Sequence, residues 1–316
     1  MSNKIIMIGR ASVGKTSIRK VIFEGHNPND LLNHPISPTR GIESIVYSWM
    51  DLELGLFDTS GQELAIILRE EETNIETFKS TDVIIYVIDY PNWEEKSQDY
   101  IEDIQKISRI IENNSLESQL ILFLHKVDKI GLKKKIPYKK IRKKILDSVD
   151  LPITPRLYFT SISPDFIYNT YNAFFEILGD LSQGCTDIKN ILDKIIKKYS
   201  KLICIVLNHN NSIIIQSITD DFNPEVIRDI YKKIAQKYLT SEKMVSIALQ
   251  IQVIAPEPLI SNIIKDSEDI YYPIVKNLIL VSELLEEKAL VALMKDIRDE
   301  LNKFYLKWAE KTVFMK

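Results

Sequence analysis

Short apolar runs alternate with helical patterns through the first half of the chain. Three of these runs are almost continuously hydrophobic, as strands buried on both faces of a parallel sheet are; they are Lys4–Ile8, Asp82–Asp89 and Leu120–His125. Between the first two, Ile42–Asp58 has the pattern of two adjacent strands that meet near residues 50 and 51. Because helical stretches separate the strands, the pattern predicts an α/β domain with a mostly parallel sheet and helices on both faces.

The clearest helical pattern covers Lys96–Asn113, where isoleucines recur at helical spacing. Further helices are expected at Thr16–Glu24, near Glu70–Phe78 and at Tyr168–Leu181. The small polar tripeptide 182–184 then interrupts the pattern. Since 316 residues are also too many for one ordinary core, we expect two domains, residues 1–181 and residues 186–316.

The second domain has a different order of elements. The expected sequence is a helix at Asp187–Tyr199, strands at Leu202–Leu207 and Ser212–Ile218, a helix from Pro224 to about Leu239, strands near Ile247–Ile254, Ile270–Val275 and Leu278–Val281, and a helix from about Leu284 to Ala309. The turn between the first two strands is rich in asparagine, which tolerates positive φ. This order predicts a smaller α+β domain.

The composition changes this picture little. Apolar residues make up 45% of the chain and charged residues 27%, as in a globular protein, and the net charge of −3 gives no reason to expect a nucleic-acid partner. Cys185 and Cys204 fit no disulfide or metal framework, so a reducing, cytoplasmic setting is expected. No run approaches the ~20 apolar residues of a membrane span, and neither terminus carries a lipidation motif. We therefore expect no direct membrane anchor, and partners would have to recruit the protein to any membrane.

Residues 9–16 form a complete G-x-x-x-x-G-K-[ST] loop, placed directly after a strand and before a helix as the motif requires. Such a loop turns successive backbone N–H groups toward phosphate, and the helix N-terminus adds positive potential. Lys15 is expected to pair with the β- and γ-phosphates of a nucleotide, and the Thr16 hydroxyl to coordinate Mg²⁺. The residues expected to contact the nucleotide here are Gly9, Ser12, Val13, Gly14, Lys15, Thr16 and Ser17.

A second group of candidates follows the expected hairpin. Asp58 lies at a strand end, where a carboxylate holds Mg²⁺, usually through water; Gly61 can offer its N–H to the γ-phosphate, and Gln62 can orient an attacking water. Thr39, between the phosphate loop and Asp58, has the position of a switch threonine that meets Mg²⁺ and the γ-phosphate. A plain turn is the rival interpretation for Thr39. The catalytic candidates are thus Gln62, Lys15 and Thr39, and the metal candidates Thr16, Thr39 and Asp58.

The base-recognition candidates follow the last two strands. His125, Lys126 and Asp128 end one strand, and the Asp128 carboxylate can accept hydrogen bonds from guanine N1–H and the 2-amino group together, where adenine has no donors. The stem of Lys126 would cover the ring face. The loop Thr160-Ser161-Ile162 would offer a backbone N–H to guanine O6. The expected ligands are therefore GTP and GDP.

In this order, the motifs resemble those of the Rag/Gtr family of small GTPases, a branch of the Ras-like superfamily, in which a hairpin is inserted into a parallel six-stranded sheet. Three features carry the resemblance: the run Gly14–Phe23, His125 in place of the asparagine of most Ras-like proteins, and Phe159–Ile162. It covers residues 4–180 in motifs. From residue 186 onward it extends only to the order of elements, which is similar to the roadblock/longin-like dimerisation domain of Rag proteins.

The resemblance implies a homodimer, or a heterodimer with a related GTPase, formed through the C-terminal domain, and a roadblock-type scaffold as a further partner. Arg40 follows Thr39 and so is a poor candidate for a built-in arginine finger, which contributes ~10³–10⁵ in rate. Slow intrinsic GTP hydrolysis, with activating and exchange proteins, is therefore expected. Ser60 stands where family members commonly have glycine, a small change.

Two other function classes remain open at this point. The first is a nucleotide-binding scaffold without turnover, which the intact Lys15, Thr39 and Gln62 disfavour. The second is a P-loop ATPase or kinase, which Asp128 and the Thr160-Ser161 loop disfavour. The basic run Lys133–Lys144 is interpreted either as a solvated helix face or as a site for an anionic membrane or acidic partner.

Overall fold

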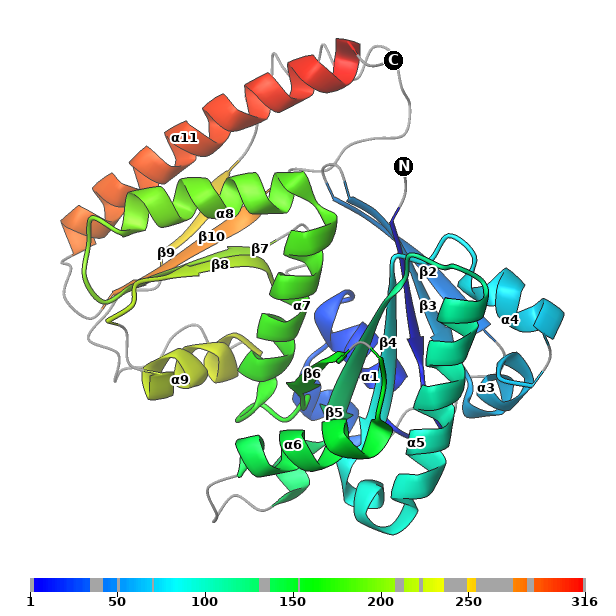
Figure 1. Cartoon of the computed structure of the whole chain (residues 1–316). Coiled ribbons are helices and arrows are strands. Elements are labelled where there is room, and N and C mark those ends of the chain that lie inside the picture. The colour runs from blue at the N-terminus through cyan, green and yellow to red at the C-terminus, as the bar shows by residue number, and fades with distance from the viewer. Residues whose placement is uncertain are drawn as a thin grey trace. The chain divides into compact units, whose positions relative to one another are not determined.

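A computed structural model describes residues 3–34, 42–49, 52–69, 71–130, 137–152, 154–207, 213–221, 224–235, 249–253, 275–282 and 287–314. The chain divides into two compact units, one comprising Met1–Ser48 and Leu52–Phe174 and the other Trp49–Asp51 and Phe175–Lys316 (Figure 1). This division falls within helix α7 (Ile167–Leu181), ahead of the polar tripeptide 182–184 at which the sequence suggested a boundary. The tripeptide itself marks the junction of two helices, because α7 ends at Leu181 and α8 (Gln183–Ile196) follows at once.

The first unit is built on a six-stranded sheet with the order β2-β3-β1-β4-β5-β6. Its strands are β1 (Asn3–Ile8), β2 (Ile42–Trp49), β3 (Leu52–Thr59), β4 (Val83–Asp89), β5 (Gln119–His125) and β6 (Arg156–Phe159). The pairs β1–β3, β1–β4, β4–β5 and β5–β6 are all parallel. The predicted α/β class, with a mostly parallel sheet, is therefore confirmed.

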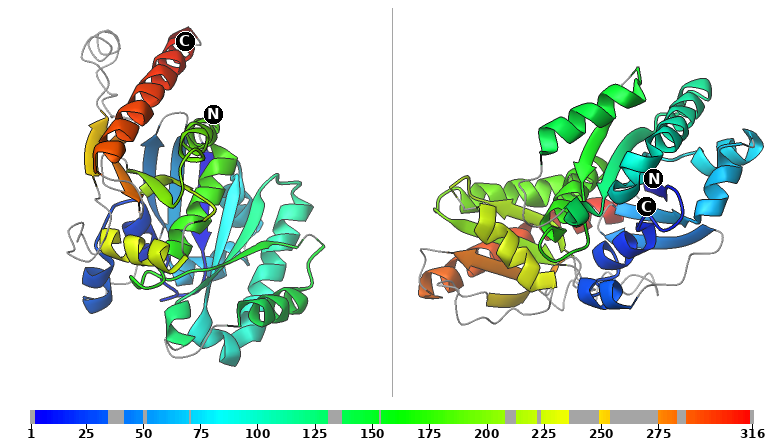
Figure 2. Two further views of the ribbon diagram at one scale, coloured as in Figure 1. Left: turned by 90° about the vertical axis from the view of Figure 1, so that its left-hand side faces the viewer. Right: turned by 90° about the horizontal axis from the view of Figure 1, so that it is seen from below.

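Helices lie on both faces of this sheet (Figures 1 and 2). They are α1 (Lys15–Ile22), α2 (Pro28–Asn33), α3 (Gly61–Ile67), α4 (Glu71–Phe78), α5 (Tyr90–Asn113), the 3₁₀ turn η1 (Val127–Ile130), α6 (Tyr138–Val149) and α7. Alternate strand residues serve the two faces. Ile84, Tyr86 and Ile88 of β4 join the core under α5, whereas Phe123 of β5 packs edge-on against Phe174 of α7 with ring centroids 5.4 Å apart.

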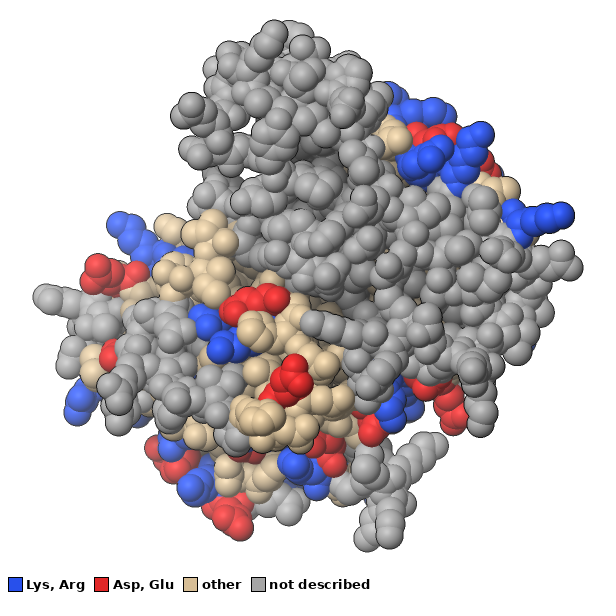
Figure 3. Space-filling view, turned by 180° about the vertical axis from the view of Figure 1, so that it is seen from behind, with Lys and Arg blue, Asp and Glu red and all other residues tan. Residues whose placement is uncertain are grey.

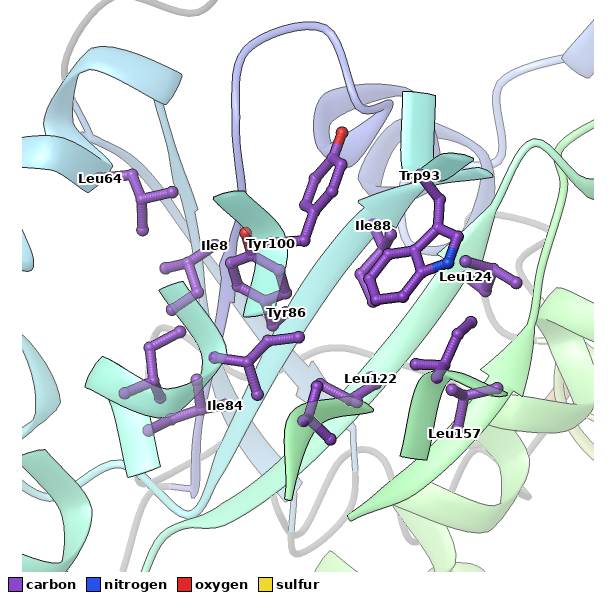
Figure 4. Close-up of a cluster of buried hydrophobic side chains, with 14 of the residues drawn as sticks. Ile8, Leu64, Ile84, Tyr86, Ile88, Trp93, Tyr100, Leu122, Leu124 and Leu157 are labelled. Carbon is purple, nitrogen blue, oxygen red and sulfur yellow. The ribbon is translucent and has the colours of Figure 1, made fainter. Parts of the chain in front are cut away.

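Figure 4 draws part of the cluster of buried side chains that forms the core under α5. Strand β4 is buried along its whole length, which explains its continuously apolar sequence. Tyr100 from α5 packs edge-on against Tyr86 from the sheet, with ring centroids 6.5 Å apart, and Trp93 lies beside Ile88 and Leu124 (Figure 4). Burying an apolar side chain of this size contributes roughly 1.5–3 kcal/mol, so this cluster fixes α5 on the sheet.

Helix α5 differs from its prediction at its start. It begins at Tyr90 rather than near Lys96, because Pro91 suits a first helical turn that follows directly on β4. Lys96 itself has a non-helical backbone, with φ −125° and ψ 28°, so that the helix is kinked there. The apolar periodicity becomes regular only after this kink, which is where the sequence suggested the start.

The second unit contains a four-stranded antiparallel sheet with the order β8-β7-β10-β9. Its described elements are α8, β7 (Leu202–Leu207), β8 (Ile213–Ile218), α9 (Pro224–Ala235), β9 (Leu249–Val253), β10 (Val275–Ser282) and α11 (Glu287–Phe314). Ser217 of β8 donates to Asp193 of α8, and its neighbour Gln216 accepts from Tyr231 of α9. Since adjacent strand residues point to opposite faces, α8 and α9 cover opposite faces of this sheet.

One prediction for this unit needs correction. The sequence suggested separate strands at Ile270–Val275 and Leu278–Val281, but β10 runs without a break from Val275 to Ser282. The polar residues Lys276 and Asn277 lie where the register with β9 shifts between Val275 and Leu278. A local irregularity of this kind disturbs the alternation of a strand without ending it. Residues 270–274 lie outside the described part of the chain.

The described surface is mixed in charge. On the side shown in Figure 3, lysines and arginines lie interspersed with aspartates and glutamates, in keeping with the small net charge. Among the residues that the structure describes, no helix is long and apolar enough to cross a bilayer.

Candidate functional site

The phosphate loop has the backbone that its glycines require. Gly9 and Gly14 have φ of +149° and +104°, and Ser12 has a φ of +60°. A Cβ at Gly9 would lie 2.6 Å from the carbonyl oxygen of Val87, so glycine is needed for close packing as well as for conformation. Alternation of left-handed and other conformations turns successive N–H groups inward, as in an anion-binding nest.

Lys15 is buried in this loop, with only 6% of its surface exposed. Its Nζ donates to the carbonyl oxygens of Gly9 at 2.8 Å and Arg10 at 3.0 Å, so the loop curls around the ammonium group. The first bond of helix α1 runs from the N–H of Ile18 to the carbonyl of Gly14. The N–H groups of Lys15, Thr16 and Ser17 therefore lie at a helix N-terminus, where anions bind. Val13, also predicted, is a buried apolar contact of the loop.

The start of helix α3 lies directly against the phosphate loop. A Cβ at Gly61 would lie 2.2 Å from the backbone nitrogen of Ala11 and 2.5 Å from its Cα, so only glycine allows this approach. Ser60 caps the helix by accepting from the N–H of Glu63 at 3.1 Å. Asp58 belongs to β3 and Gln62 to α3, but their side chains, and all of Thr39, lie outside the described part of the chain.

The loop after β5 contacts the phosphate loop at two points. Lys126 has a φ of +62°, and its Nζ donates to the carbonyl of Ser12 at 2.7 Å and to Asp89 Oδ2 at 2.9 Å. The His125 ring fills the space beside Gly14, where a Cβ would lie 2.7 Å from the ring carbon Cδ2. The loop after β5 and the phosphate loop are therefore packed together as one unit.

His125 is almost fully buried, with 1% exposure, and its Nδ1 lies 3.0 Å from Thr160 Oγ1. Burial, with a smaller contribution from the charge of Lys126, lowers the pKa of His125 to about 3. The imidazole is therefore neutral at physiological pH, and its role is to join the two base-side loops. The N–H of Thr160 donates to the carbonyl of Leu124 at 2.9 Å, which completes this junction.

Asp128 is oriented by the neighbouring loop. Ser161 Oγ donates to Asp128 Oδ1 at 2.6 Å, and the N–H of Ser163 donates to Ser161 Oγ at 2.9 Å. The backbone of Ser161 is fixed in turn by Thr170 on α7, whose hydroxyl accepts from its N–H at 3.0 Å and donates to its carbonyl at 2.8 Å. Ile162, the last predicted residue of this loop, is buried.

The structure thus brings together the predicted residues of the phosphate loop, Gly61, and the residues of both base-side loops. Sequence analysis missed Asp89, Thr170 and Arg10, each of which holds one of these loops. Asp89 had a usable signal, since it ends a buried parallel strand and the carboxyl ends of such strands carry binding sites. Within the described residues no group of three or more histidine, cysteine or acidic side chains is arranged to hold a metal ion.

The strand order, the phosphate loop after β1 and the paired loops after β5 and β6 define a Ras-like nucleotide-binding domain. The family model described as the Gtr1/RagA G protein conserved region matches residues 4–247. The chain therefore belongs to the Gtr1/RagA G protein family, which confirms the family suggested by the motifs.

Two relatives, from Dictyostelium discoideum and Saccharomyces cerevisiae, agree with this membership. The chain is 28% identical over 203 residues to the Ras-related GTP-binding protein A of Dictyostelium discoideum, over 62% of this chain and 64% of that one. It is 26% identical over 278 residues to the GTP-binding protein GTR2 of Saccharomyces cerevisiae, over 84% and 72% of the two chains. The Arl6 BBS3 small GTPase of Trypanosoma brucei, solved with GppNp, overlays with a TM-score of 0.41 at 16% identity, over 59% of this chain and 99% of that one.

Proposed function

We propose that this protein is a switch that binds GTP or GDP and hydrolyses GTP slowly. The observation that carries the proposal is the packed junction of the three loops. Lys126 holds the base loop to the phosphate loop through Ser12, and the carboxylate of Asp128 is fixed by Ser161 on the same edge of the sheet. A base at Asp128 and phosphates at Lys15 would then be bound by one rigid surface.

Guanine fits the base side of this surface. Its N1–H and 2-amino groups are neighbouring donors that one carboxylate accepts together, and Ser161 leaves Asp128 with further lone pairs for them. Adenine offers no donor at position 1 or 2. In the loop Thr160-Ser161-Ile162, the N–H of Thr160 donates to Leu124 and that of Ser161 to Thr170. The N–H of Ile162 is therefore proposed to serve the O6 acceptor, which adenine lacks.

The phosphate side suits a magnesium-bound triphosphate. The buried ammonium of Lys15 and the N–H groups at the start of α1 supply positive potential for the β- and γ-phosphates. Thr16 at the start of α1 fits one place in an oxygen-ligand shell for Mg²⁺, and Asp58 and Thr39 are proposed as the other ligands. Bound Mg²⁺ would neutralise charge that develops between the β- and γ-phosphates.

Gln62 is the proposed water-orienting residue. The close approach of Gly61 to Ala11 supports this role, because it brings the start of α3 within reach of the γ-phosphate position. With Thr39, Gln62 would form the pair of switch segments that a γ-phosphate orders and that relax after hydrolysis.

Gln62→Leu is expected to keep GDP and GTP affinity within about threefold while single-turnover GTP hydrolysis falls by about tenfold or more, since the glutamine acts only on water in the transition state. Radiolabelled GTP and quenched time points measure this rate. Gln98→Leu, on α5, is a matched control and should hydrolyse at the wild-type rate. Equal rates for Gln62→Leu and wild type would instead favour the scaffold function, in which nucleotide is bound without turnover.

We also propose that the protein works as a dimer through residues 186–316, with a second copy or a related GTPase, in the cytoplasm or on membranes to which partners recruit it. The antiparallel sheet of this unit supports the proposal, because β8 and β9 are edge strands in the described order and edge strands can pair with another chain. Sedimentation of the full chain over a concentration series, compared with residues 1–181 alone, tests it. A full chain that sediments as a monomer throughout, with no relative co-purifying, would contradict it.

A further inference from the structure

The second residue of the phosphate loop, Arg10, extends its side chain toward helix α5. Its Nε donates to Asp103 Oδ2 at 2.8 Å, and Nη1 donates to Asp99 Oδ2 at 2.9 Å. Nη2 donates to Asp103 Oδ1 at 3.2 Å and to the backbone carbonyl of Asp99 at 3.1 Å. Four hydrogen bonds thus fix one guanidinium to two consecutive turns of α5, in the two-pronged geometry that makes arginine pairs specific.

The acceptor side of this contact is rigid. Asp103 is only 7% exposed, and it accepts a further hydrogen bond from the Tyr86 hydroxyl at 2.7 Å. Burial raises the pKa of Tyr86, so the hydroxyl remains a donor. The Arg10 guanidinium also lies 5.7 Å from the centre of the Tyr100 ring, which stacks on Trp93 in the core of Figure 4. All three aromatic residues belong to the cluster that fixes α5 on the sheet.

The other end of Arg10 forms part of the phosphate site. Its carbonyl oxygen accepts from Lys15 Nζ at 3.0 Å, beside the carbonyl of Gly9 at 2.8 Å. Arg10 follows Gly9, which has a φ of +149°. Because glycine has no side chain, it does little to restrain the backbone of the loop. The residue that positions a carbonyl for Lys15 is therefore the residue whose side chain is fixed to α5.

We propose that the contact of Arg10 with Asp99, Asp103 and Tyr86 holds the phosphate loop in its binding conformation before nucleotide arrives. Arg10 is thus a positioning residue, which acts on the phosphates through the loop backbone and through Lys15. The inference rests on the proposed nucleotide-binding function. It follows that removing the contact weakens binding of GDP and GTP by the same factor, because the ordering cost is the same for both.

Removing the Arg10 contact should weaken binding of the nucleotide phosphates more than binding of the base. GMP depends on the base-side loops more than GDP does, since it lacks the β-phosphate that Lys15 meets. A loss of general stability would lower the affinities for GMP and GDP together. Loss of loop ordering lowers the affinity for GDP more than that for GMP, so the ratio of the two affinities separates the explanations.

The test uses the full chain with Arg10→Met and Asp103→Asn combined. The double variant leaves no buried carboxylate without its cation, which would itself be destabilising, and asparagine still accepts from Tyr86. The GDP-to-GMP affinity ratio, measured by competition with a fluorescent nucleotide, is expected to fall about tenfold, the scale of ordering one backbone residue. The GTP-to-GDP ratio should not change.

Arg10→Lys with Asp103 intact should recover part of the loss, since one ammonium reaches one carboxylate but not both. The matched control is Arg19→Met with Glu24→Gln, an ion pair near the far end of α1 in which Arg19 is buried and Glu24 partly exposed, with N and O 3.2 Å apart. This control is expected to lower the melting temperature but to leave the GDP-to-GMP affinity ratio within about twofold of wild type, because the pair does not hold the phosphate loop.

A GDP-to-GMP ratio that stays within twofold of wild type in the Arg10 and Asp103 double variant would overturn the inference. The inference would also be overturned if the Arg19→Met and Glu24→Gln control lowered the GDP-to-GMP affinity ratio by the same factor. Failure of the proposed function gives a different result, namely a wild-type chain that does not prefer GDP to ADP. In that case the ratio of ADP affinity to AMP affinity is measured instead, so that the role of Arg10 is tested whichever base the protein prefers.

Discussion

Lys15→Ala is expected to abolish nucleotide binding at micromolar concentrations, with the Kd values of GDP and GTP raised by about 10²–10⁴. Lys15 is buried, and its ammonium group lies inside the loop that would surround the phosphates. Each hydrogen bond to a charged group contributes about 1.5–3 kcal/mol, and the ammonium is proposed to meet two phosphates. Because these contacts exist in the bound ground state, affinity is lost and not only rate.

Titration with a fluorescent GDP analogue measures this loss. Lys20→Ala, on the same helix and half-buried, is the matched control and should bind as wild type does. Melting curves without nucleotide show whether both variants are folded. If folded Lys15→Ala bound GDP within about threefold of wild type, the loop of residues 9–16 would not be a phosphate site.

Asp128→Asn is expected to weaken GTP and GDP by about 10²–10⁴ and to raise the affinity for xanthosine nucleotides above that for guanosine nucleotides. The carboxylate is proposed to accept two hydrogen bonds from guanine, each worth about 1.5–3 kcal/mol as a charged bond. Xanthine carries a carbonyl at position 2, to which the new amide N–H₂ can donate. Ser161 donates to Asp128 Oδ1 and can still donate to the asparagine oxygen, so the side chain should keep its orientation.

Competition of GDP, XDP and ADP for the same site decides this prediction. Asp147→Asn removes an exposed carboxylate from α6 and should leave the preference for guanine unchanged. An Asp128→Asn variant that still prefers GDP to XDP would show that another residue selects the base. Displacement of GDP from the wild-type chain by equal ADP would contradict guanine recognition altogether.

Much of the fold could be predicted because its signals are local. β1, β4 and β5 are buried on both faces and so are apolar at nearly every position. The phosphate loop could be found for the same reason, since the glycines, the lysine and the flanking strand and helix are contiguous. The interval Ile42–Asp58 was correctly divided into β2 and β3.

Other features depend on contacts between distant residues and left no such pattern. Arg10 and Asp103 are 93 positions apart, and no local rule connects an arginine in a loop with one aspartate among several on a helix. The kink at Lys96 hid the start of α5, and the polar residues at the register shift near Lys276 led to the prediction of two strands in place of β10. Helices α2 and α3 were not predicted from the sequence, because helices of 6 and 7 residues are too short for a clear apolar period.

The contact between His125 and Gly14 also limits how this sequence can diverge. Any side chain at position 14 would meet both a strained φ of +104° and the imidazole ring, and a larger ring-side residue would push the phosphate loop outward. Thr160 contacts the same imidazole ring, with its hydroxyl oxygen 3.0 Å from His125 Nδ1. Position 14 therefore admits glycine alone, whereas residues 125 and 160, which share a buried contact, are expected to exchange together rather than singly.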